Sequence, residues 1–318
     1  MTIQILILLV SLTFIILGAD WLVDGASSIA RKAGISEFVI GLTIVGFGTS
    51  CPELVVSLTG AFAGNSDISI GNVVGSNIFN VLLILGITAL IRPIPITWEN
   101  KRRDIPMTIG VTMLLIICGM SKTLFNIGAG DNLSRLEGAL FLLLFAAYIY
   151  SCFKHNTAEE DDPDAKHFGV AASIGLVLAG LAGLILGGKF FVSSATNIAQ
   201  TLGVSDKFIA ITILAGGTSL PELATCIVAA AKNKGQLALG NILGSNIFNI
   251  LLILGCSAVV TPLHFAGMSL VDMAVLLISV ILVSLSALMG RKNLMDRFDG
   301  SVMLLCEAAY MFWLIINL

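Results

Sequence analysis

The sequence predicts an all-α membrane protein of ten transmembrane helices, arranged as two inverted five-helix repeats with broken helices near the membrane midplane. Three observations predict this fold class: the composition, the spacing of polar segments and an internal repeat. The 318 residues are 57% hydrophobic and 12% charged, with a mean hydropathy of +0.99, whereas a soluble domain carries about 25% charged residues. The net charge of −3 offers no basic face, which excludes nucleic acid as a partner.

Ten apolar segments lie between polar punctuation, and a helix needs about 20 residues to cross the core of a bilayer. The predicted spans are residues 3–23, 36–63, 69–91, 104–121, 134–153, 168–191, 205–231, 238–261, 269–289 and 298–317. The acidic segment 154–167 is expected to be a short cytoplasmic linker. It separates a first repeat, residues 1–153, from a second repeat, residues 168–318.

The Lys and Arg residues are divided unequally between the two sets of alternate loops. One set holds 13 of them, whereas the other holds only Lys122, Arg135, Lys189 and Lys207. Loops rich in Lys and Arg stay in the cytoplasm. We therefore expect a multi-pass protein of the plasma (inner) membrane with both termini outside, and Asp20 and Asp24 as interfacial charges near the cytoplasmic end of the first span.

An internal repeat is stronger evidence than hydropathy. Segment 41–86 aligns without gaps on segment 210–255, with 22 of 46 positions identical at a constant offset of 169. The most similar parts are GTSCPEL against GTSLPEL, and GNVVGSNIFN against GNILGSNIFN. Because each half has five spans, an odd number, the two halves must enter the membrane from opposite sides. Secondary transporters are often built this way, with their sites at the midplane between the repeats.

Each GTSxPEL motif places a proline inside an apolar span. Pro52 and Pro221 lack an N–H and clash with the carbonyl four residues earlier, so both helices should break and release carbonyls around residues 46–49 and 215–218. Free carbonyls at this depth are tolerated where they face protein or a hydrated cavity. The six cysteines form no CxxC motif, and the oxygen-rich surroundings favour Ca²⁺ or Na⁺ over zinc or copper.

Glu53 and Glu222 fall near the middle of the second and seventh predicted spans. Burying one ionised carboxylate there costs about 2.5 kcal/mol or more, and two at symmetric places repel each other, so a bound cation removes both penalties. The alternative is that each glutamate caps a broken helix or stays protonated. Duplication within one motif favours the ion site. Glu307, mid-span in the last helix, has no evident repeat partner and could be protonated, paired or involved in transport.

The GNxxGSNIFN segments are expected to form the facing wall of the site. Their glycines fit close helix approach: Gly71, Gly75, Gly240 and Gly244. Positions four apart share a helix face, which assigns four polar residues to the cavity: Ser76, Asn80, Ser245 and Asn249. The other asparagines are expected to bind neighbouring backbone: Asn72, Asn77, Asn241 and Asn246. Small and polar residues are also ordinary contacts between membrane helices.

The paired GTSxPE and GSNxxN motifs resemble the alpha repeats of the cation/calcium exchanger superfamily, specifically compact prokaryotic members of its sodium/calcium exchanger branch. The resemblance implies an antiporter, not an enzyme, that exchanges Ca²⁺ for Na⁺ by alternating access and needs no cofactor. It also implies that the first and sixth spans slide across a rigid core, which Gly18 and Gly187 would permit. The implied partners are the two ions, with H⁺ as an alternative, and the lipid bilayer; a monomer is compatible with this function.

Carried over to this chain, the resemblance implies that Ca²⁺ binds Glu53 and Glu222 and the carbonyls of Thr49 and Thr218. It implies sodium sites at four serines: Ser50, Ser76, Ser219 and Ser245. Both threonines would help, with carbonyls near Gly46 and Ala215. Asn80 and Asn249 match the position that lines the centre of the site. Some relatives carry Asp where this chain has Asn249, so two carboxylates are expected here, not three.

Three other functions are compatible with parts of the pattern. A calcium/proton exchanger would use the same glutamates to carry protons, although the duplicated serines favour sodium. An intramembrane hydrolase would use Ser50 or Ser219, but neither has a histidine or lysine base nearby in the membrane. A passive cation channel would conduct without depending on a counter-ion.

Overall fold

The computed structural model describes residues 2–126, 130–154, 168–203, 215–289 and 293–317. Two predictions fall largely on the remaining residues: nearly all of the linker 154–167, and the first half of the predicted span 205–231, which includes Lys207. Both lie outside the described residues. Within the described residues, every long element is helical, as the sequence predicts.

Seven of the described helices are long and apolar enough to cross a membrane. Five are single elements: α1 (Thr2–Ala33), α9 (Arg135–Lys154), α10 (Val170–Thr201), α16 (Leu270–Met289) and α17 (Arg297–Asn317). The other two are composite: Ser66–Ile91, made of α5 (Ser66–Phe79), η2 (Asn80–Leu85) and α6 (Gly86–Ile91), and Gly235–Val260, made of α14 (Gly235–Ile247), η5 (Phe248–Leu254) and α15 (Gly255–Val260). The segments labelled η are π-helical.

An eighth span is present if the helix pair Glu37–Thr49 and Cys51–Phe62, bent by 49°, is counted as one broken span. It consists of α2 (Glu37–Ile40), η1 (Gly41–Val45), α3 (Gly46–Thr49) and α4 (Cys51–Phe62). Predicted span 104–121 corresponds to α7 (Ile105–Gly119), which follows η3 (Asn100–Asp104) and precedes the short α8 (Ser121–Phe125). Predicted span 205–231 is described from α12 (Ala215–Gly217) and α13 (Leu220–Ala231).

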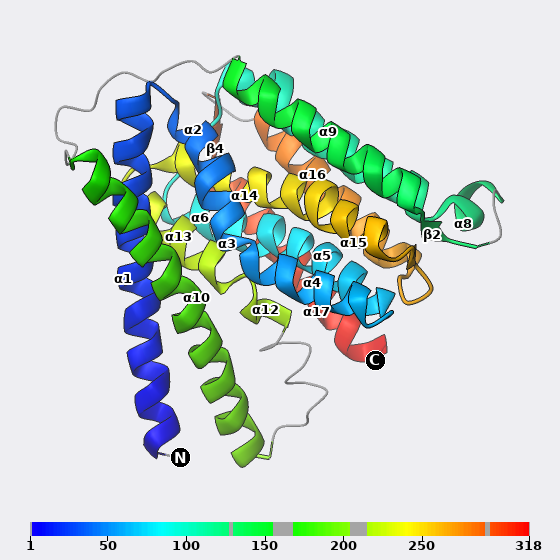
Figure 1. Cartoon of the computed structure of the whole chain (residues 1–318), viewed down its shortest axis with the longest axis horizontal. Helices are drawn as coiled ribbons and strands as arrows, with labels where there is room; N and C mark the ends of the chain where they lie inside the picture. The colour runs from blue at the N-terminus through cyan, green and yellow to red at the C-terminus, as the bar shows by residue number, and fades with distance from the viewer. Residues whose placement is uncertain (1, 127–129, 155–167, 204–214, 290–292, 318) are drawn as a thin grey trace.

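The two spans that carry the GNxxGSNIFN motif form the centre of the molecule. In the apolar stretch of Gly235–Val260, 83% of the residues are buried, and in Ser66–Ile91 67% are buried. The corresponding shares are 22% for α1 and α9 and 17% for α17, so these helices expose most of their apolar surface, as expected of helices that face lipid. Figure 1 shows α9 on one outer edge of the bundle and α14 in its interior.

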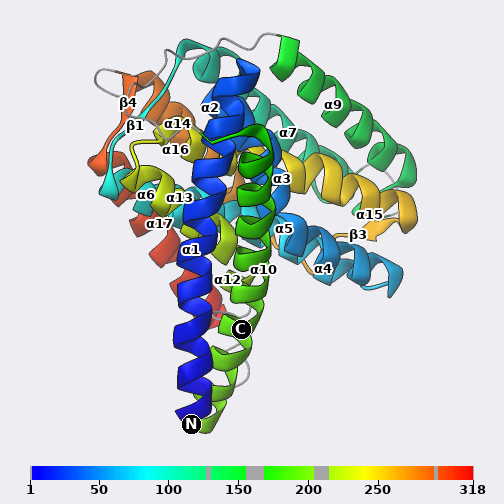
Figure 2. The same cartoon turned by 60° about the vertical axis from the view of Figure 1, so that its left-hand side comes forward.

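Helices α1 and α10 pack side by side along their length and stand apart from the other helices at their lower ends (Figures 1 and 2). Glycines make this contact possible. A Cβ on Gly18 would lie 2.8 Å from the carbonyl oxygen of Gly180, and a Cβ on Gly187 would lie 3.1 Å from that of Ser11. Gly18 and Gly187 therefore join α1 to α10, and they do not form the sliding surface against the core that we expected.

Two short antiparallel strand pairs connect the halves of the chain. Strand β1 (Ile94–Pro95) pairs with β4 (Leu294–Met295), and β2 (Asn132–Leu133) pairs with β3 (Leu263–His264). Strands β1 and β3 are related by the same offset that relates the two repeats. Each of these strands is therefore held by a loop of the other half.

Helices α9 and α17 are also similar in sequence, a repeat that we did not predict. RLEGALFLLLFAAYIY of α9 (135–150) aligns on RFDGSVMLLCEAAYMF of α17 (297–312). The contacts agree with the alignment. Tyr148 donates a hydrogen bond to Asp104 at 3.1 Å, and Tyr310 donates one to Asp272 at 2.8 Å. Glu307 thus has a repeat partner after all, which is Phe145.

The acidic residues of α1 are not simply interfacial charges. Lys232, at the end of α13, lies 2.6 Å from a carboxylate oxygen of Asp20 and 2.5 Å from one of Asp24. Helix α1 continues past both residues to Ala33. These ion pairs connect α1 to the core at the end of α13.

We predict that Gly18→Leu separates α1 from α10 and lowers the thermal stability of the purified protein. The new side chain would meet backbone atoms, which cannot move aside easily, and overpacking of this kind costs about 1–3 kcal/mol. The midpoint of thermal unfolding in detergent measures the effect. Gly175→Leu is the matched control, because a Cβ at Gly175 of α10 meets open space. An equal midpoint for both variants would contradict the prediction.

Candidate ion-binding site

The second span breaks at Ser50, as predicted from Pro52. Helix α3 ends at Thr49 and α4 begins at Cys51, with Ser50 between them at φ −83° and ψ 7°. In the second repeat, Ser219 precedes α13 with nearly the same angles, φ −89° and ψ 8°. Both glutamates therefore lie in the first turn of a helix, where the helix dipole favours negative charge.

The two predicted carboxylates are buried, and each accepts a hydrogen bond from the opposite repeat. Ser219 Oγ donates a hydrogen bond to Glu53 Oε1 at 3.2 Å, and Ser50 Oγ donates one to Glu222 Oε1 at 3.0 Å. Glu53 is 1% exposed and Glu222 is fully buried. The Oε2 atom of each glutamate has no hydrogen-bond partner among the described residues. One oxygen of each carboxylate is thus positioned by the protein, while the other is uncommitted.

The broken segment of the first repeat lies directly against α14. Thr49 Oγ1 is 3.2 Å from Asn241 Oδ1 and 3.1 Å from the carbonyl oxygen of Val45. A Cβ on Gly46 would lie 3.4 Å from the backbone nitrogen of Ser245. The carbonyl of Gly46 was expected to be released, but it accepts the backbone N–H of Ser50 at 3.1 Å. The helical hydrogen bond thus survives at this position.

Four asparagines form a reciprocal network at the crossing of α5 and α14. Asn77 Nδ2 donates to the carbonyl of Asn246 at 3.2 Å, and Asn246 Nδ2 donates to that of Asn77 at 3.3 Å. Their side-chain oxygens in turn accept the amides of Asn80 at 3.1 Å and Asn249 at 2.9 Å. This orients the Oδ1 atoms of Asn80 and Asn249, which are buried and have no partner among the described residues.

The prediction that the other asparagines bind backbone is therefore correct for Asn77 and Asn246, although the backbone belongs to the opposite repeat. Asn72 Nδ2 also donates to the backbone carbonyl of Glu53, at 3.1 Å. Asn241 differs, because its side chain contacts the side chains of Thr49 and Cys226. The sequence placed these residues in a supporting role without indicating their partners.

Both Asn80 and Asn249 lie in π-helical turns, which the sequence analysis did not anticipate. Asn80 begins η2, and Asn249 is the second residue of η5. A π-helical turn inserts an extra residue into a helix and is frequently found at functional sites. Only the duplicated NIFNxLLILG sequence after each GS pair could have drawn attention to these positions.

Six buried oxygens of predicted ion-binding residues lack a hydrogen-bond partner among the described residues. They are Glu53 Oε2, Glu222 Oε2, Asn80 Oδ1, Asn249 Oδ1, Thr218 Oγ1 and Ser245 Oγ. An unsatisfied buried polar group costs about 1–3 kcal/mol, so this set needs a compensating ligand. All six atoms are hard oxygen ligands, which suit Ca²⁺ or Na⁺. Of the other predicted ligands, Ser76 is buried, with 3% of its surface exposed. Ala215 begins α12, and its side chain is not among those that the structure describes.

The GNxxG glycines of the two repeats do not have the same role. Gly240 and Gly244 lie against the backbone of Phe38 and Leu42, as expected for close helix approach. The prediction is wrong for Gly71 and Gly75, because no described element packs closely on them. Both instead line a cavity of about 1590 Å³, together with Ser76 and Thr218 of the candidate site.

Comparison with known proteins places this geometry in a family. The profile of the family described as sodium/calcium exchanger protein matches residues 3–154 and 172–316. The chain is 39% identical over 330 residues to the putative antiporter CaxA of Alkalimonas amylolytica, with 99% of each chain covered. It is 36% identical to the sodium/calcium exchanger MaX1 of Methanosarcina acetivorans, with 98% of each chain covered.

Solved structures of the sodium-calcium exchanger NCX_Mj have the same fold. The structure soaked with zero Na⁺ and Ca²⁺ matches with a TM-score of 0.84 at 33% identity and covers 98% of each chain. The structure soaked with 2.5 mM Na⁺ and 0.1 mM Ca²⁺ matches with a TM-score of 0.83 at 32% identity, covering 99% of this chain and 98% of that one.

We predict that Asn77→Ala lowers the thermal unfolding midpoint of the protein. The substitution leaves the amide of Asn249 and the carbonyl of Asn246 without their partners, at about 1–3 kcal/mol for each unsatisfied buried group. Asn317→Ala serves as the control, because the hydrogen bond described for the Asn317 side chain, to the Trp313 carbonyl, is exposed. Equal midpoints would show that the asparagine network is not a structural support.

Proposed function

This chain belongs to the sodium/calcium exchanger family, and we propose that it exchanges Ca²⁺ for Na⁺ through a site formed by Glu53 and Glu222. As a member of the family it is a multi-pass membrane antiporter and not an enzyme, with Ca²⁺ and Na⁺ as its transported ions and no need of a cofactor. What we propose beyond family membership is which ions are coupled, how the transport cycle runs and which residues bind the ions.

The observation that carries the proposal is the reciprocal arrangement of the two glutamates. Each is buried, each accepts a hydrogen bond from the serine of the other repeat, and each has one oxygen without a partner in the described part of the chain. Two ionised carboxylates, each of charge −1, need a cation at membrane depth. One Ca²⁺ or two Na⁺ would neutralise them, so the two ions compete for the same pair.

The proposed ligands are those that the resemblance to sodium/calcium exchangers implies. Ca²⁺ would bind the carboxylates of Glu53 and Glu222 and the carbonyls of Thr49 and Thr218. Na⁺ would bind at the serines of both repeats: Ser50, Ser76, Ser219 and Ser245. The threonines and the carbonyls near Gly46 and Ala215 would complete these sites, with Asn80 and Asn249 lining their centre. The Gly46 carbonyl would contribute a second lone pair, because it already accepts the backbone N–H of Ser50. This assignment is supported by side-chain oxygens that have no partner among the described residues, those of Thr218, Ser245, Asn80 and Asn249.

We further propose ten transmembrane helices in two inverted repeats, residues 1–153 and 168–318, joined by the linker 154–167. Symmetric contacts support this architecture. The hydrogen bonds of Ser50 and Ser219, and those of Tyr148 and Tyr310, are equivalent pairs from the two halves. Each half contributes an odd number of predicted spans, so the two halves would have opposite orientations in the membrane.

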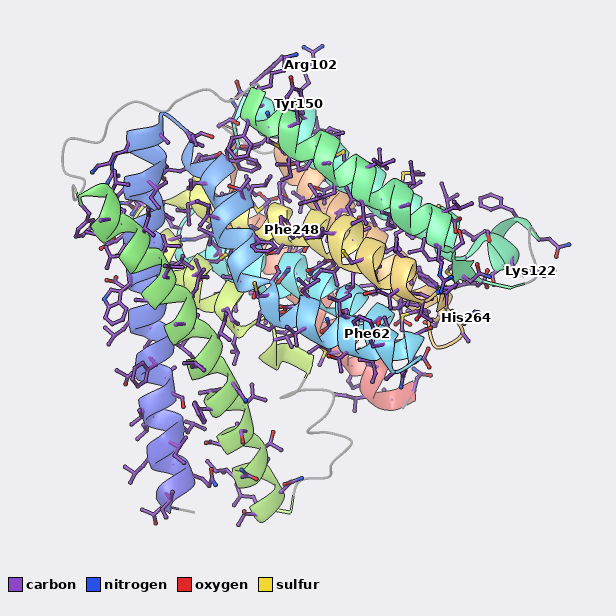
Figure 3. All side chains as sticks on the ribbon, viewed as in Figure 1. Phe62, Arg102, Lys122, Tyr150, Phe248 and His264 are labelled. Carbon is purple, nitrogen blue, oxygen red and sulfur yellow. The ribbon has the colours of Figure 1, made fainter. Side chains whose placement is uncertain are left out.

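The proposed orientation has the Lys- and Arg-rich loops in the cytoplasm and both termini outside, in the plasma membrane. Arg102 comes from the rich set of loops and Lys122 from the poor set. Figure 3 shows these two residues at opposite ends of the helical bundle, with His264 at the same end as Lys122. The positive-inside rule then assigns the end with Arg102 to the cytoplasm.

Alternating access would require α1 and α10 to move together against the rest of the molecule. Small residues of the site face α10: a Cβ on Gly48 or on Gly217 would meet the side chains of Leu181 or Val192. These contacts are with side chains and not with backbone, so they can adjust. An empty site with two negative charges would be costly to carry through an apolar barrier, which makes exchange obligatory.

A calcium/proton exchanger is the second candidate, because two buried carboxylates can also carry protons. The duplicated serine and threonine oxygens around them favour sodium, since a proton needs no coordination shell. Uptake of calcium-45 into proteoliposomes, driven by a sodium gradient or by a pH gradient, separates the two candidates. We expect uptake with the sodium gradient alone.

We predict that Glu53→Gln and Glu222→Gln each abolish sodium-driven calcium-45 uptake. Glutamine keeps the size of the side chain but removes the charge that holds the cation, and losing one of two carboxylates should reduce uptake to background. Glu99→Gln is the control, because it makes the same chemical change at a residue before η3, away from the site. Wild-type uptake by either site variant would remove the basis of the proposed function.

The ion pairs of Lys232 allow a prediction about the transport cycle. They connect α1 to α13 at the proposed cytoplasmic end, so opening that side should break them. Lys232→Gln removes both ion pairs, so it should favour the cytoplasm-facing state and lower the apparent KM for cytoplasmic Ca²⁺ at least about two- to five-fold, since one partly exposed ion pair contributes up to about 1 kcal/mol. Flux measurements on inside-out vesicles test this.

Lys234→Gln is the matched control for this prediction. Lys234 lies 2.7 Å from Glu37, and this pair joins α2 to the start of α14, both within the core. Its loss should leave the cytoplasmic KM unchanged. An equal shift in both variants would mean that the effect is one of surface charge and not of the contact with α1.

A further inference from the structure

The cavity beside the candidate site contains a carboxylate that the proposed exchange mechanism does not use. The cavity lies between α5, α10, α16 and α17, and Glu307 of α17 lines it together with Thr218 and Ser76. Glu307 is 5% exposed, and its Oε2 has no hydrogen-bond partner among the described residues. An uncommitted, buried carboxylate thus shares a cavity with two residues of the ion site.

The repeat shows what this position would be in a symmetric molecule. Glu307 aligns with Phe145, because FAAY of α9 corresponds to EAAY of α17. Phe145 packs edge-on against Phe248, with their ring centroids 4.7 Å apart. Phe248 also packs against Phe47, with ring centroids 5.2 Å apart. In Figure 3, Phe248 lies near the middle of the bundle. Three aromatic rings therefore lie together at this place in one repeat.

The equivalent place in the other repeat is open and contains a carboxylate. At the repeat offset, Phe248 corresponds to Phe79 and Phe47 corresponds to Gly216. A Cβ on Gly216 would lie 3.3 Å from the ring of Phe79, so these two residues are in contact as their counterparts are. Phe79, Gly216 and Glu307 all line the cavity. One aromatic ring is thus replaced by a carboxylate and another by a glycine.

We propose that Glu307 binds a cation in this cavity, where a hydrated Ca²⁺ or Na⁺ is held on its way between the surrounding water and Glu53 and Glu222. The proposal rests on the proposed exchange function. The two halves would then give ions unequal access to the site. A route through this cavity would include a cation-binding step at Glu307, whereas a route past the aromatic cluster of Phe47, Phe145 and Phe248 would not.

The other charged groups of the cavity are compatible with a cation. Asp272 also lines it, and its Oδ1 accepts the hydroxyl of Tyr310 while its Oδ2 accepts the backbone N–H of Ser269. Lys189 of α10 is exposed at the cavity and makes no described ion pair with Glu307. The two carboxylates and one ammonium give a net charge of −1. The phenol of Tyr310, three residues after Glu307, adds a neutral oxygen.

Side-specific transport kinetics test the proposal. In Glu307→Gln, the apparent KM for Ca²⁺ should rise about five-fold from one side of the membrane only, the effect of losing one screened charge. The maximal rate and the KM from the other side should stay within about two-fold of the wild type. Right-side-out and inside-out vesicles give the two values. Glu307→Phe, which restores the aromatic residue of α9, should slow uptake from the same side.

Glu99→Gln is the control for loss of one carboxylate elsewhere in the chain. An unchanged KM from both sides in Glu307→Gln would overturn the proposal. An equal rise from both sides would also overturn it, because that result indicates general damage or an effect on the central site.

A second measurement does not depend on transport. Dicyclohexylcarbodiimide modifies carboxyl groups in apolar surroundings, and mass spectrometry of the peptide that contains Glu307 reports the extent of modification. In the double variant Glu53→Gln/Glu222→Gln, Ca²⁺ should protect Glu307 from the reagent. Modification at the same rate with and without Ca²⁺ would contradict binding at Glu307. Because the central site is disabled, this result stands even if the chain proves not to exchange sodium for calcium.

Discussion

The arrangement on which the rest of the structure depends is the pairing of two buried carboxylates from opposite halves of the chain. Glu53 and Glu222 each accept a hydrogen bond from the serine of the other repeat, at 3.2 and 3.0 Å, so neither half can form this centre alone. Two such groups in an apolar interior repel each other and lose their hydration. The surrounding structure makes their positions possible, and a cation would make their charge tolerable.

Several local departures from regular helix serve this centre. Both glutamates lie in the first turn after a helix break, where Ser50 and Ser219 have nearly identical backbone angles. The π-helical turns at Asn80 and Asn249 accompany side-chain oxygens that have no other partner among the described residues. The small residues Gly240 and Gly244 let the second span lie directly on α14. Each departure weakens a helix locally and is compensated by packing within the buried core.

Much of this could be predicted from the sequence, because the determining features are local or duplicated. Pro52 and Pro221 predict the helix breaks, and a seven-residue motif with a glutamate occurring twice predicts a shared site. The reciprocal amide bonds of Asn77 and Asn246 could not be predicted, since they depend on how two helices far apart in the sequence cross. The π-helical turns have no simple sequence signal. The packing of Gly18 and Gly187 was assigned to the wrong interface, because a glycine shows that something approaches closely but not what approaches.

The repeat also shows where the molecule departs from symmetry. Gly71 and Gly75 line a cavity, whereas their counterparts are covered by the backbone of the second span. Glu307 stands where the first half has Phe145, within an alignment that could have been found from the sequence had the fifth spans been compared. Differences between equivalent positions are therefore as informative as the identities, because they mark where the two halves of the molecule have different chemistry.

Anomalous diffraction from crystals soaked in Ca²⁺ or Sr²⁺ tests the central claim most directly. The account predicts one strong peak between the two repeats, about 2.3–2.6 Å from a carboxylate oxygen of both Glu53 and Glu222, as for protein-bound Ca²⁺. The peak should weaken as Na⁺ replaces Ca²⁺ in the soak. The absence of a peak between these carboxylates, or a divalent ion bound only elsewhere in the chain, would contradict it.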